Sequence, residues 1–259
     1  MTVPVKLGKR HARHDPRVPR LSMHATALPP PPPSSNWWAT VGDWPMLAND
    51  IAGDCVEAAM MHLIYQQASY TTPGLAPIPT AAETLAFYSA VTGYIPGNDA
   101  TDQGSFVLGS SGAMARWFRD GIVCGGVPNH VTSFLQITQP RPEEWRQSIS
   151  LFSNLLIGVH LPLSIIDGDA VPECWRDFAG PIAGGHEVLV CGYQTLNSGV
   201  YYDLISWGSH YVATEDFLLH TLDEAVTVLN PAFLNALGVN PVGIDHTALL
   251  ADMESMRAE

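Results

Sequence analysis

Apolar residues recur at helical spacing through the first half of the chain. From Asp54 onwards they return every three or four positions, which predicts a helix over about 54–67. Asp54 is suited to the N-cap of this helix, and Glu57 three residues later would complete a capping box. Residues 80–92 and 110–120 have the same helical character. The pattern therefore predicts a largely helical first half.

After about residue 154 the pattern changes to short apolar runs separated by Gly and Pro. These runs predict strands at 155–161, 186–193 and 200–207. Past residue 214 the chain is expected to be helical again and to end in a helix at about 245–256. Helices followed by strands predict an α+β protein with two lobes.

Five consecutive prolines at 29–33 cannot enter a helix or a central strand, so they separate an N-terminal arm from the body of the protein. We divide the chain into four segments. They are a basic arm with its polyproline linker (1–33), a helical lobe (34–150), a β-rich lobe (151–213) and a helical C-terminal extension (214–259).

The 259-residue chain is 46% hydrophobic, which is enough for a large core, and its net charge is −13. Residues 1–20 carry six Lys and Arg against one acidic residue, a net charge of +5, which leaves −18 on the rest. An acidic body repels phosphate backbones, so we expect no nucleic-acid partner. The basic arm is free to dock on its own acidic body, on a neighbouring subunit or on another acidic protein, or to stay solvated.

Lysine occurs only at Lys6 and Lys9, both in the arm. The body therefore contains neither a Schiff-base lysine nor a P-loop, which excludes pyridoxal enzymes, P-loop NTPases and kinases. No apolar run is long enough to span a membrane, and the start of the chain lacks the apolar region of a secretory signal. We expect a cytosolic protein without a membrane partner.

Cys55 and His186 are the residues that best fit catalytic chemistry. Cys55 lies in the first turn of the helix that Gly53-Asp54 opens, where backbone N–H groups and the helix dipole favour a thiolate. His186 follows Gly184-Gly185 at the start of an expected strand. A thiol nucleophile and a histidine base need to meet only in space, so the 131 intervening residues do not oppose the pairing.

Four segments, in the right order, resemble those of papain-like cysteine peptidases. Ser35-Asn36-Trp37 resembles the segment near the mature start of that family, and Trp37 precedes Cys55 by the family's 18 residues. Residues 49–55, the Gly-Gly-His186 strand and Ser206-Trp207-Gly208 resemble the family's cysteine, histidine and Asn-Ser-Trp-Gly segments. Asn49-Asp50 and Gly53-Asp54-Cys55 also form the "ND-x-x-GDC" signature of a group of uncharacterised phage and actinobacterial proteins.

The resemblance implies a role for each matching residue. Cys55 would be the nucleophile and His186 the general base and acid. Asn49 would replace the oxyanion-hole glutamine, with the Cys55 backbone N–H as second donor. Trp207 would shield His186 from water, although an ordinary core tryptophan fits the sequence as well.

The departures from the family pattern affect the third catalytic group and the disulfides. Ile205 stands where the family has its catalytic asparagine, so another residue must orient His186. Asp203 would share a strand face with Ile205 and is our candidate. The four cysteines lack the family's spacing, so we expect four free thiols in a reducing compartment. Only a 33-residue arm and linker stands where the family has a long inhibitory propeptide.

The sequence therefore predicts a papain-like α+β fold and a cysteine hydrolase that cleaves a peptide, an isopeptide or a peptidoglycan amide through an acyl-enzyme. No cofactor and no metal are expected. Transfer of the acyl group to an amine would use the same two residues. The alternative is a papain-fold protein without catalysis, acting as a structural or interaction subunit. The phage resemblance would place such a subunit in a virion, or the enzyme in the cytoplasm of a host cell.

Overall fold

The computed structural model describes residues 5–13, 15–24, 28–137, 141–230 and 233. The helices are α1 (Leu21–His24), α2 (Cys55–Thr71), α3 (Ala81–Thr92), α4 (Ala113–Asp120), α5 (Pro142–Phe152) and α6 (Glu215–Thr221), with short 3₁₀ turns at Asp99–Thr101 and Leu163–Ile165. The strands are β1 (Ser34–Asn36), β2 (Ile122–Cys124), β3 (Val127–Asn129), β4 (Ser133–Gln136), β5 (Leu155–Pro162), β6 (Cys174–Trp175), β7 (Ile182–Leu196), β8 (Gly199–Ser206), β9 (Ser209–Thr214) and β10 (Leu222–Leu229). The chain is an α+β protein, as the sequence predicts.

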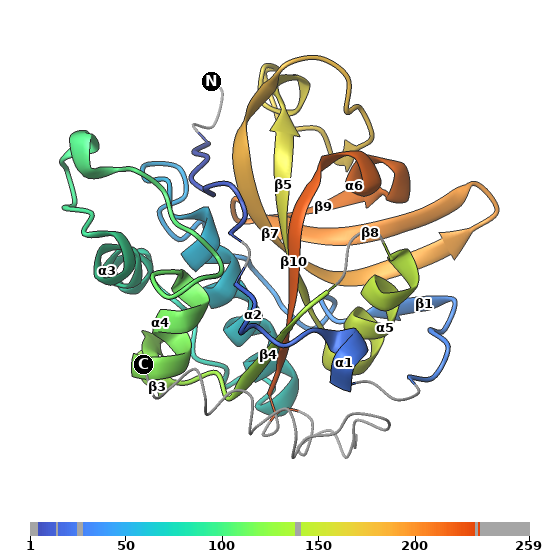
Figure 1. Cartoon of the computed structure of the whole chain (residues 1–259), viewed down its shortest axis with the longest axis horizontal. Helices are drawn as coiled ribbons and strands as arrows, with labels where there is room; N and C mark the ends of the chain where they lie inside the picture. The colour runs from blue at the N-terminus through green and yellow to red at the C-terminus, as the bar shows by residue number, and fades with distance from the viewer. Residues whose placement is uncertain (1–4, 14, 25–27, 138–140, 231–232, 234–259) are drawn as a thin grey trace.

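One large sheet forms the second half of the fold. Its strands are ordered β4-β10-β5-β7-β8-β9-β6, β1 adds to β7, and every pairing except β6 with β9 is antiparallel. Figure 1 shows α2, α3 and α4 on one side and the curled sheet on the other, with the dark-blue N-terminal segment running between them. A single apolar core joins α2 to the sheet, so the two sides are packed together rather than independent.

The long helices and strands form where the patterns place them. The expected helices at 54–67, 80–92 and 110–120 correspond to α2, α3 and α4, and the three expected strands correspond to β5, β7 and β8. Almost every residue of α2 is buried, so apolar residues occur on all faces of this helix.

Asp54 is the N-cap residue of α2 as expected, but the expected capping box is absent. Asp54 makes no side-chain cap hydrogen bond, so there is no capping box at α2, whereas Thr80 and Glu83 form one at α3. Asp54 is fully buried, and its side chain makes no hydrogen bond to the first-turn amides.

The expected helical extension after residue 214 is correct only for α6. Residues 222–229 form β10, which lies between β4 and β5 inside the sheet. Its run from Ala225 to Leu229 is buried throughout and rich in β-branched residues, as a strand covered on both faces requires. The helix expected at 245–256 lies outside the described residues.

Candidate active site

Cys55 begins α2 at the junction between the helices and the sheet, and it is only 1% exposed. The backbone amides of Glu187 and Gly8 lie at its sulfur and favour its charged form. Burial nevertheless raises the pKa of the thiol to about 12, and the neighbouring carboxylates of Glu187 and Glu57 act in the same direction. With the cleft as it stands, Cys55 is a neutral thiol.

His186 lies in β7, directly before Glu187, whose amide contacts the Cys55 sulfur. Its Nε2 is 2.6 Å from the Ser206 hydroxyl, whereas its buried Nδ1 has no hydrogen-bond partner among the described residues. Burial lowers the pKa of His186 to about 3, so the ring is neutral. His186 thus directly precedes a residue that lies at Cys55, and burial favours the uncharged form of both side chains.

Ser206 is the partner of His186 that the sequence did not point to, and the role expected for Asp203 is wrong. Asp203 instead accepts a hydrogen bond from His210 at 2.8 Å. Alternate residues of a strand face opposite sides, so Asp203 shares a face with Ile205 while Ser206 projects from the other face, toward His186. Ser206 was visible in the Ser-Trp-Gly motif, but only tertiary structure shows which face meets the histidine.

Trp207 covers the His186 ring. The two rings are stacked with centroids 4.2 Å apart and planes 16° from parallel. Trp207 and Gly208 both have positive φ, 46° and 65°, in the two-residue turn between β8 and β9. This backbone geometry is that of a type I′ hairpin turn, and it places the indole over the imidazole. The arrangement fits the shielding role expected for Trp207.

Asn49 is buried beside the cleft, where its side-chain amide donates to the carbonyl oxygen of Lys6 at 3.3 Å. The Trp207 indole N–H donates to the same oxygen, also at 3.3 Å. A second bond joins the Asn49 amide to the Ala52 carbonyl and sets its direction. Asn49 therefore points an N–H at a peptide carbonyl in the cleft, as an oxyanion donor must.

The N-terminal arm occupies this cleft as an extended peptide. Its backbone bonds both walls: Lys9 N–H donates to the Gly185 carbonyl at 3.1 Å, and Arg10 N–H donates to the Ser105 carbonyl at 2.8 Å. Ser105 N–H in turn donates to the Gly8 carbonyl at 2.8 Å. Lys6 N–H donates to the Asn49 carbonyl at 2.9 Å. The arm thus docks on its own body through main-chain hydrogen bonds, the kind of contact that any extended peptide can make.

Glycines make room for the arm on both sides of the contact. A Cβ added to Gly8 would lie 1.7 Å from the Gly53 carbonyl oxygen. On the body, Cβ atoms at Gly104 and Gly185 would lie 2.1 Å and 2.2 Å from carbonyl oxygens of the arm. Such distances are far inside van der Waals contact, so the arm fits only because these side chains are absent.

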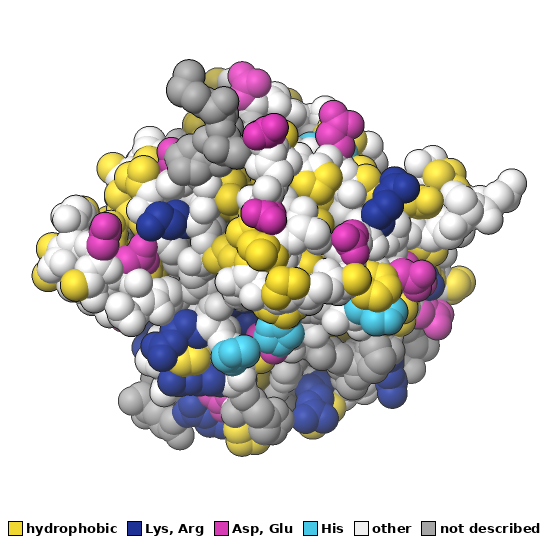
Figure 2. Space-filling model, turned by 90° about the horizontal axis from the view of Figure 1, so that it is seen from above, with side chains coloured by type: hydrophobic (Ala, Val, Ile, Leu, Met, Phe, Trp, Pro, Cys, Tyr) yellow, Lys and Arg dark blue, Asp and Glu magenta, His cyan; other side chains and the backbone are white. Residues whose placement is uncertain are grey.

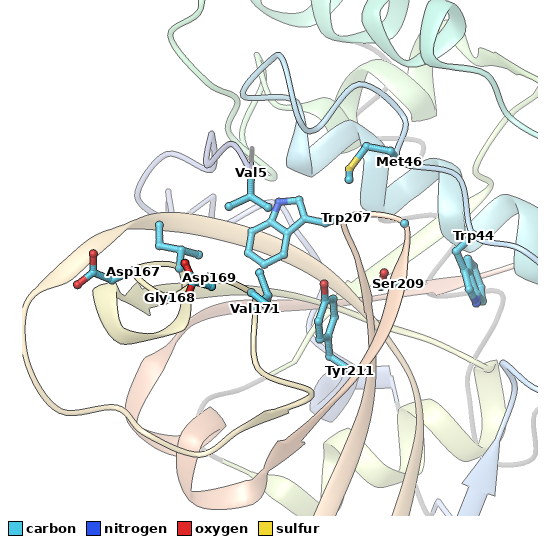
Figure 3. Close-up of a pocket in the computed structure, with 13 residues that line it drawn as sticks. Val5, Trp44, Met46, Asp167, Gly168, Asp169, Val171, Trp207, Ser209 and Tyr211 are labelled. Atoms are coloured by element: carbon cyan, nitrogen blue, oxygen red, sulfur yellow. The ribbon is translucent and has the colours of Figure 1, made fainter. Parts of the chain in front are cut away.

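A cavity of about 740 Å³ opens beyond Trp207. Figure 3 shows Val5 of the arm, Trp207 and Met46 on one side of it and Asp169, Val171 and Tyr211 on the other. Because Val5 and Trp207 belong to the occupied cleft, this cavity continues the cleft past the candidate catalytic residues. An extended ligand would have space there.

Two acidic side chains, Asp54 and Glu57, lie at the start of α2, next to the residue that carries the thiol. Burial, followed by the charge of Glu57, raises the pKa of Asp54 to about 9, and burial raises that of Glu57 to about 8. Glu57 accepts a hydrogen bond from Ser105 at 2.6 Å. Both groups hold a proton at neutral pH, so they add little negative charge next to Cys55.

Asp54→Asn should weaken the dependence of stability on pH. A carboxyl whose folded-state pKa is raised favours the folded state fully below about pH 4 and loses that contribution as pH rises toward 9. Over this window, the unfolding free energy of the parent protein should fall more steeply than that of Asp54→Asn, by up to about 1.4 kcal/mol per pH unit. Urea unfolding at pH 5, 7 and 9 measures this, with the exposed Asp43→Asn as matched control. Parallel curves for the parent and Asp54→Asn would show that Asp54 is not a buried neutral acid.

The solved structures that resemble this chain are papain-like cysteine proteases. Xylellain, a cysteine protease from Xylella fastidiosa, superposes with a TM-score of 0.66 at 13% identity, covering 89% of this chain and 98% of xylellain. Digestive procathepsin L 3 from the larval midgut of Tenebrio molitor gives 0.59 at 12% identity, covering 88% and 77%. A procathepsin B from Trypanosoma congolense gives 0.52 at 12% identity, covering 86% of each chain. No protein-family model and no curated protein sequence matches the chain.

These likenesses confirm the papain-like fold that the sequence predicts. At such identities they concern the fold alone. Within the described residues, all four cysteines are free, and no helix combines the length and apolarity that crossing a bilayer requires.

Proposed function

We propose that the chain is a papain-like cysteine hydrolase that cleaves a peptide or related amide bond through an acyl-enzyme on Cys55, and that the N-terminal arm holds it latent. The observation that carries the proposal is the arm itself. It lies as an extended peptide against Cys55, with a carbonyl directed at the amide of Asn49. A cleft that binds backbone in this way beside a thiol and an imidazole is suited to peptide chemistry.

The roles of the residues follow from their contacts. His186 would take the thiol proton on Nδ1, which has no hydrogen-bond partner in the described part of the chain, while Ser206 holds Nε2. The thiolate would attack the substrate carbonyl carbon, and Asn49 would stabilise the resulting oxyanion. The imidazolium would then protonate the departing amine as the C–N bond breaks. Water, activated by the same imidazole, would release the acid from the thioester.

Latency has a direct physical cause in this arrangement. The arm removes water from the site, and desolvation is the main reason that the thiol pKa is high and the imidazole pKa is low. Proton transfer from Cys55 to His186 would therefore create two buried charges at a large cost. Departure of the arm would rehydrate the pair and allow a thiolate–imidazolium to form.

The alternative is a papain-fold interaction subunit, for instance of a phage particle. The arm-filled cleft favours it, because burial of the thiol opposes a thiolate. The two functions differ in what the cleft does once the arm is displaced. An enzyme would form a covalent adduct with a substrate, and a binding subunit would not.

Trapping an acyl-enzyme tests the proposal. The full chain carrying Gly8→Val, which displaces the arm by steric conflict, would be incubated with a panel of peptides, isopeptides and peptidoglycan fragments and quenched in acid. We expect intact-mass analysis to show a thioester on Cys55 with at least one substrate, and Cys55→Ala in the same background to show none. An open, alkylatable cleft that forms no adduct and no product with any of them would favour the binding subunit.

A further inference from the structure

Lys9 of the arm fills a pocket in the body of the protein, and its side chain is only 1% exposed. Its Nζ lies 2.5 Å from the Asp223 carboxylate, 2.7 Å from that of Glu224 and 3.0 Å from the Arg10 carbonyl oxygen. The Asp223 carboxylate and the Arg10 carbonyl oxygen accept hydrogen bonds from the ammonium, and Glu224 forms an ion pair with it. The other lysine of the chain, Lys6, leaves its side chain exposed, so only Lys9 enters the body in this way.

The pocket is more acidic than one lysine requires. Glu187 from β7 lies close enough to interact with the Lys9 charge, and neither of its buried carboxylate oxygens has a hydrogen-bond partner among the described residues. Glu224 is equally buried. Burial would lower the pKa of Lys9, but Glu224, Glu187 and Asp223 outweigh it and raise that pKa. Burial raises the pKa of Glu187 and Glu224, and the Lys9 ammonium opposes that shift in both, so the pocket favours a cation.

The walls of the pocket are shaped for an unbranched side chain. Gly158 of β5 lies against the stem, where a Cβ would be 1.7 Å from the Lys9 Cε. The aliphatic stem of Lys9 thus passes through a gap that an alanine at position 158 would close. A compact ammonium with three donors suits this narrow pocket, whereas the planar guanidinium of arginine is wider and presents its donors in a fork.

The pocket belongs to the body rather than to the arm. Gly158, Glu187, Asp223 and Glu224 come from β5, β7 and β10, and the Lys9 amide is bonded to Gly185 at the start of the same β7 segment. A peptide that replaced the arm would therefore meet the same carboxylates. Main-chain contacts accept any sequence, so discrimination between peptides falls to pockets such as this one.

We propose that this pocket, formed by Gly158, Glu187, Asp223 and Glu224, is a lysine-binding specificity pocket, so that the cleft selects peptides carrying a lysine side chain at this point. As a statement about substrates it rests on the hydrolase proposed above. As a statement about binding it does not, because the pocket would select a lysine peptide whether or not Cys55 reacts.

The test measures binding without chemistry. The full chain carrying Gly8→Val and Lys9→Met presents an emptied cleft, and the probe is a fluorescein-labelled peptide with the sequence of residues 5–13. A second probe has norleucine, a lysine without its ammonium group, in place of Lys9, and a third has arginine there. We expect fluorescence anisotropy to give the lysine probe an affinity about tenfold or more above that of either analogue.

Glu224→Gln in the same background should reduce the preference for lysine over norleucine several-fold, and the exposed Glu173→Gln is its matched control. Equal affinity for lysine and norleucine, or a preference that Glu224→Gln leaves unchanged, would overturn the proposal. If lysine is preferred but no peptide is cleaved, the pocket stands and the hydrolase fails. If a peptide is cleaved but lysine is not preferred, the hydrolase stands and the lysine pocket fails.

The otherwise unaltered chain offers a second test that needs no peptide. Lys9→Met leaves buried carboxylates without their cation and should loosen the arm, raising the alkylation rate of Cys55 about tenfold or more. Lys6→Met, at the exposed lysine, should leave that rate unchanged. Identical rates for the two variants would show that the pocket contributes nothing to holding a lysine.

Discussion

Gly8→Val should raise the alkylation rate of Cys55 at pH 7.5 by about a hundredfold or more. The valine Cβ would lie 1.7 Å from the Gly53 carbonyl oxygen, and this is backbone that cannot move without disturbing the start of α2. The arm must leave its place over the thiol, and water then enters. A thiol pKa that falls from about 12 toward the ordinary value near 8.5 increases the thiolate fraction by about three orders of magnitude.

The measurement is the rate of iodoacetamide modification, located by peptide mass spectrometry. Gly42→Val is the matched control, because a Cβ at Gly42 has no neighbouring atom within 4 Å. Circular dichroism and a cooperative melting transition establish that both variants are folded. An alkylation rate for Gly8→Val that equals the Gly42→Val rate would mean that the arm does not protect Cys55.

His186→Ala in the Gly8→Val background should lower the rate of amide hydrolysis by about 10²–10⁴-fold. This is the range that a positioned general base contributes to catalysis. The pH profile of Cys55 alkylation provides a readout independent of the substrate. Its midpoint should move upward in the variant, because the imidazolium that stabilises the thiolate is gone.

Ser206→Ala separates positioning from proton transfer. Loss of the 2.6 Å bond to Nε2 should lower hydrolysis less than loss of the ring, by about tenfold, since the base remains but its orientation is freer. Asp203→Asn should have no comparable effect, because Asp203 contacts His210. An unchanged rate in His186→Ala would remove His186 from the mechanism.

The pH behaviour of latency follows from the same contacts. Asp223 has a lowered pKa although burial opposes it, because Lys9, the Ala12 amide and His160 stabilise its charge. The contribution of this carboxylate is present above the ordinary aspartate pKa and is lost only as pH falls below about 4. The contact between Lys9 and Asp223 should therefore persist at neutral pH. Acidification would act on the arm first through Glu224 and Glu187, whose pKa values burial raises.

The charge distribution agrees with an arm that docks in place. Figure 2 shows acidic side chains spread over the upper and middle parts of this face and most of its Lys and Arg side chains in the lower part. Arg10 and Arg13 of the arm both lie over the Phe106 ring, with guanidinium carbons 4.3 Å and 3.3 Å from its centroid. These cation–π contacts bind the arm to the body on the C-terminal side of Lys9, and they are made by two of the basic residues of the arm.

Local patterns were enough for the elements that carry the two candidate catalytic residues. Helical periodicity after Asp54 placed Cys55 in the first turn of α2, and the apolar run after Gly184-Gly185 placed His186 in β7. Both follow from the spacing of apolar side chains over a few turns or pleats, which neighbouring residues decide. The papain-like order of four short motifs added the expectation that the two elements meet.

Other features depended on contacts between residues far apart in the chain. The sequence could not show that β8 turns Ser206 rather than Asp203 toward His186, because this depends on which face of the strand packs against β7. It could not show that residues 222–229 are a strand, because a short apolar run becomes one only when β4 and β5 lie on either side.

By itself the sequence determined helices α2, α3 and α4 and strands β5, β7 and β8, the position of the thiol at a helix N-terminus, and the segregation of every lysine into a basic arm. The tertiary structure alone decided where that arm goes and what it does to the chemistry. Lys9 meets Asp223 and Glu224 across more than 200 residues, and Gly8 covers Cys55. Whether a thiol is an exposed nucleophile or a buried neutral group depends on its solvation, and solvation is a property of the assembled fold.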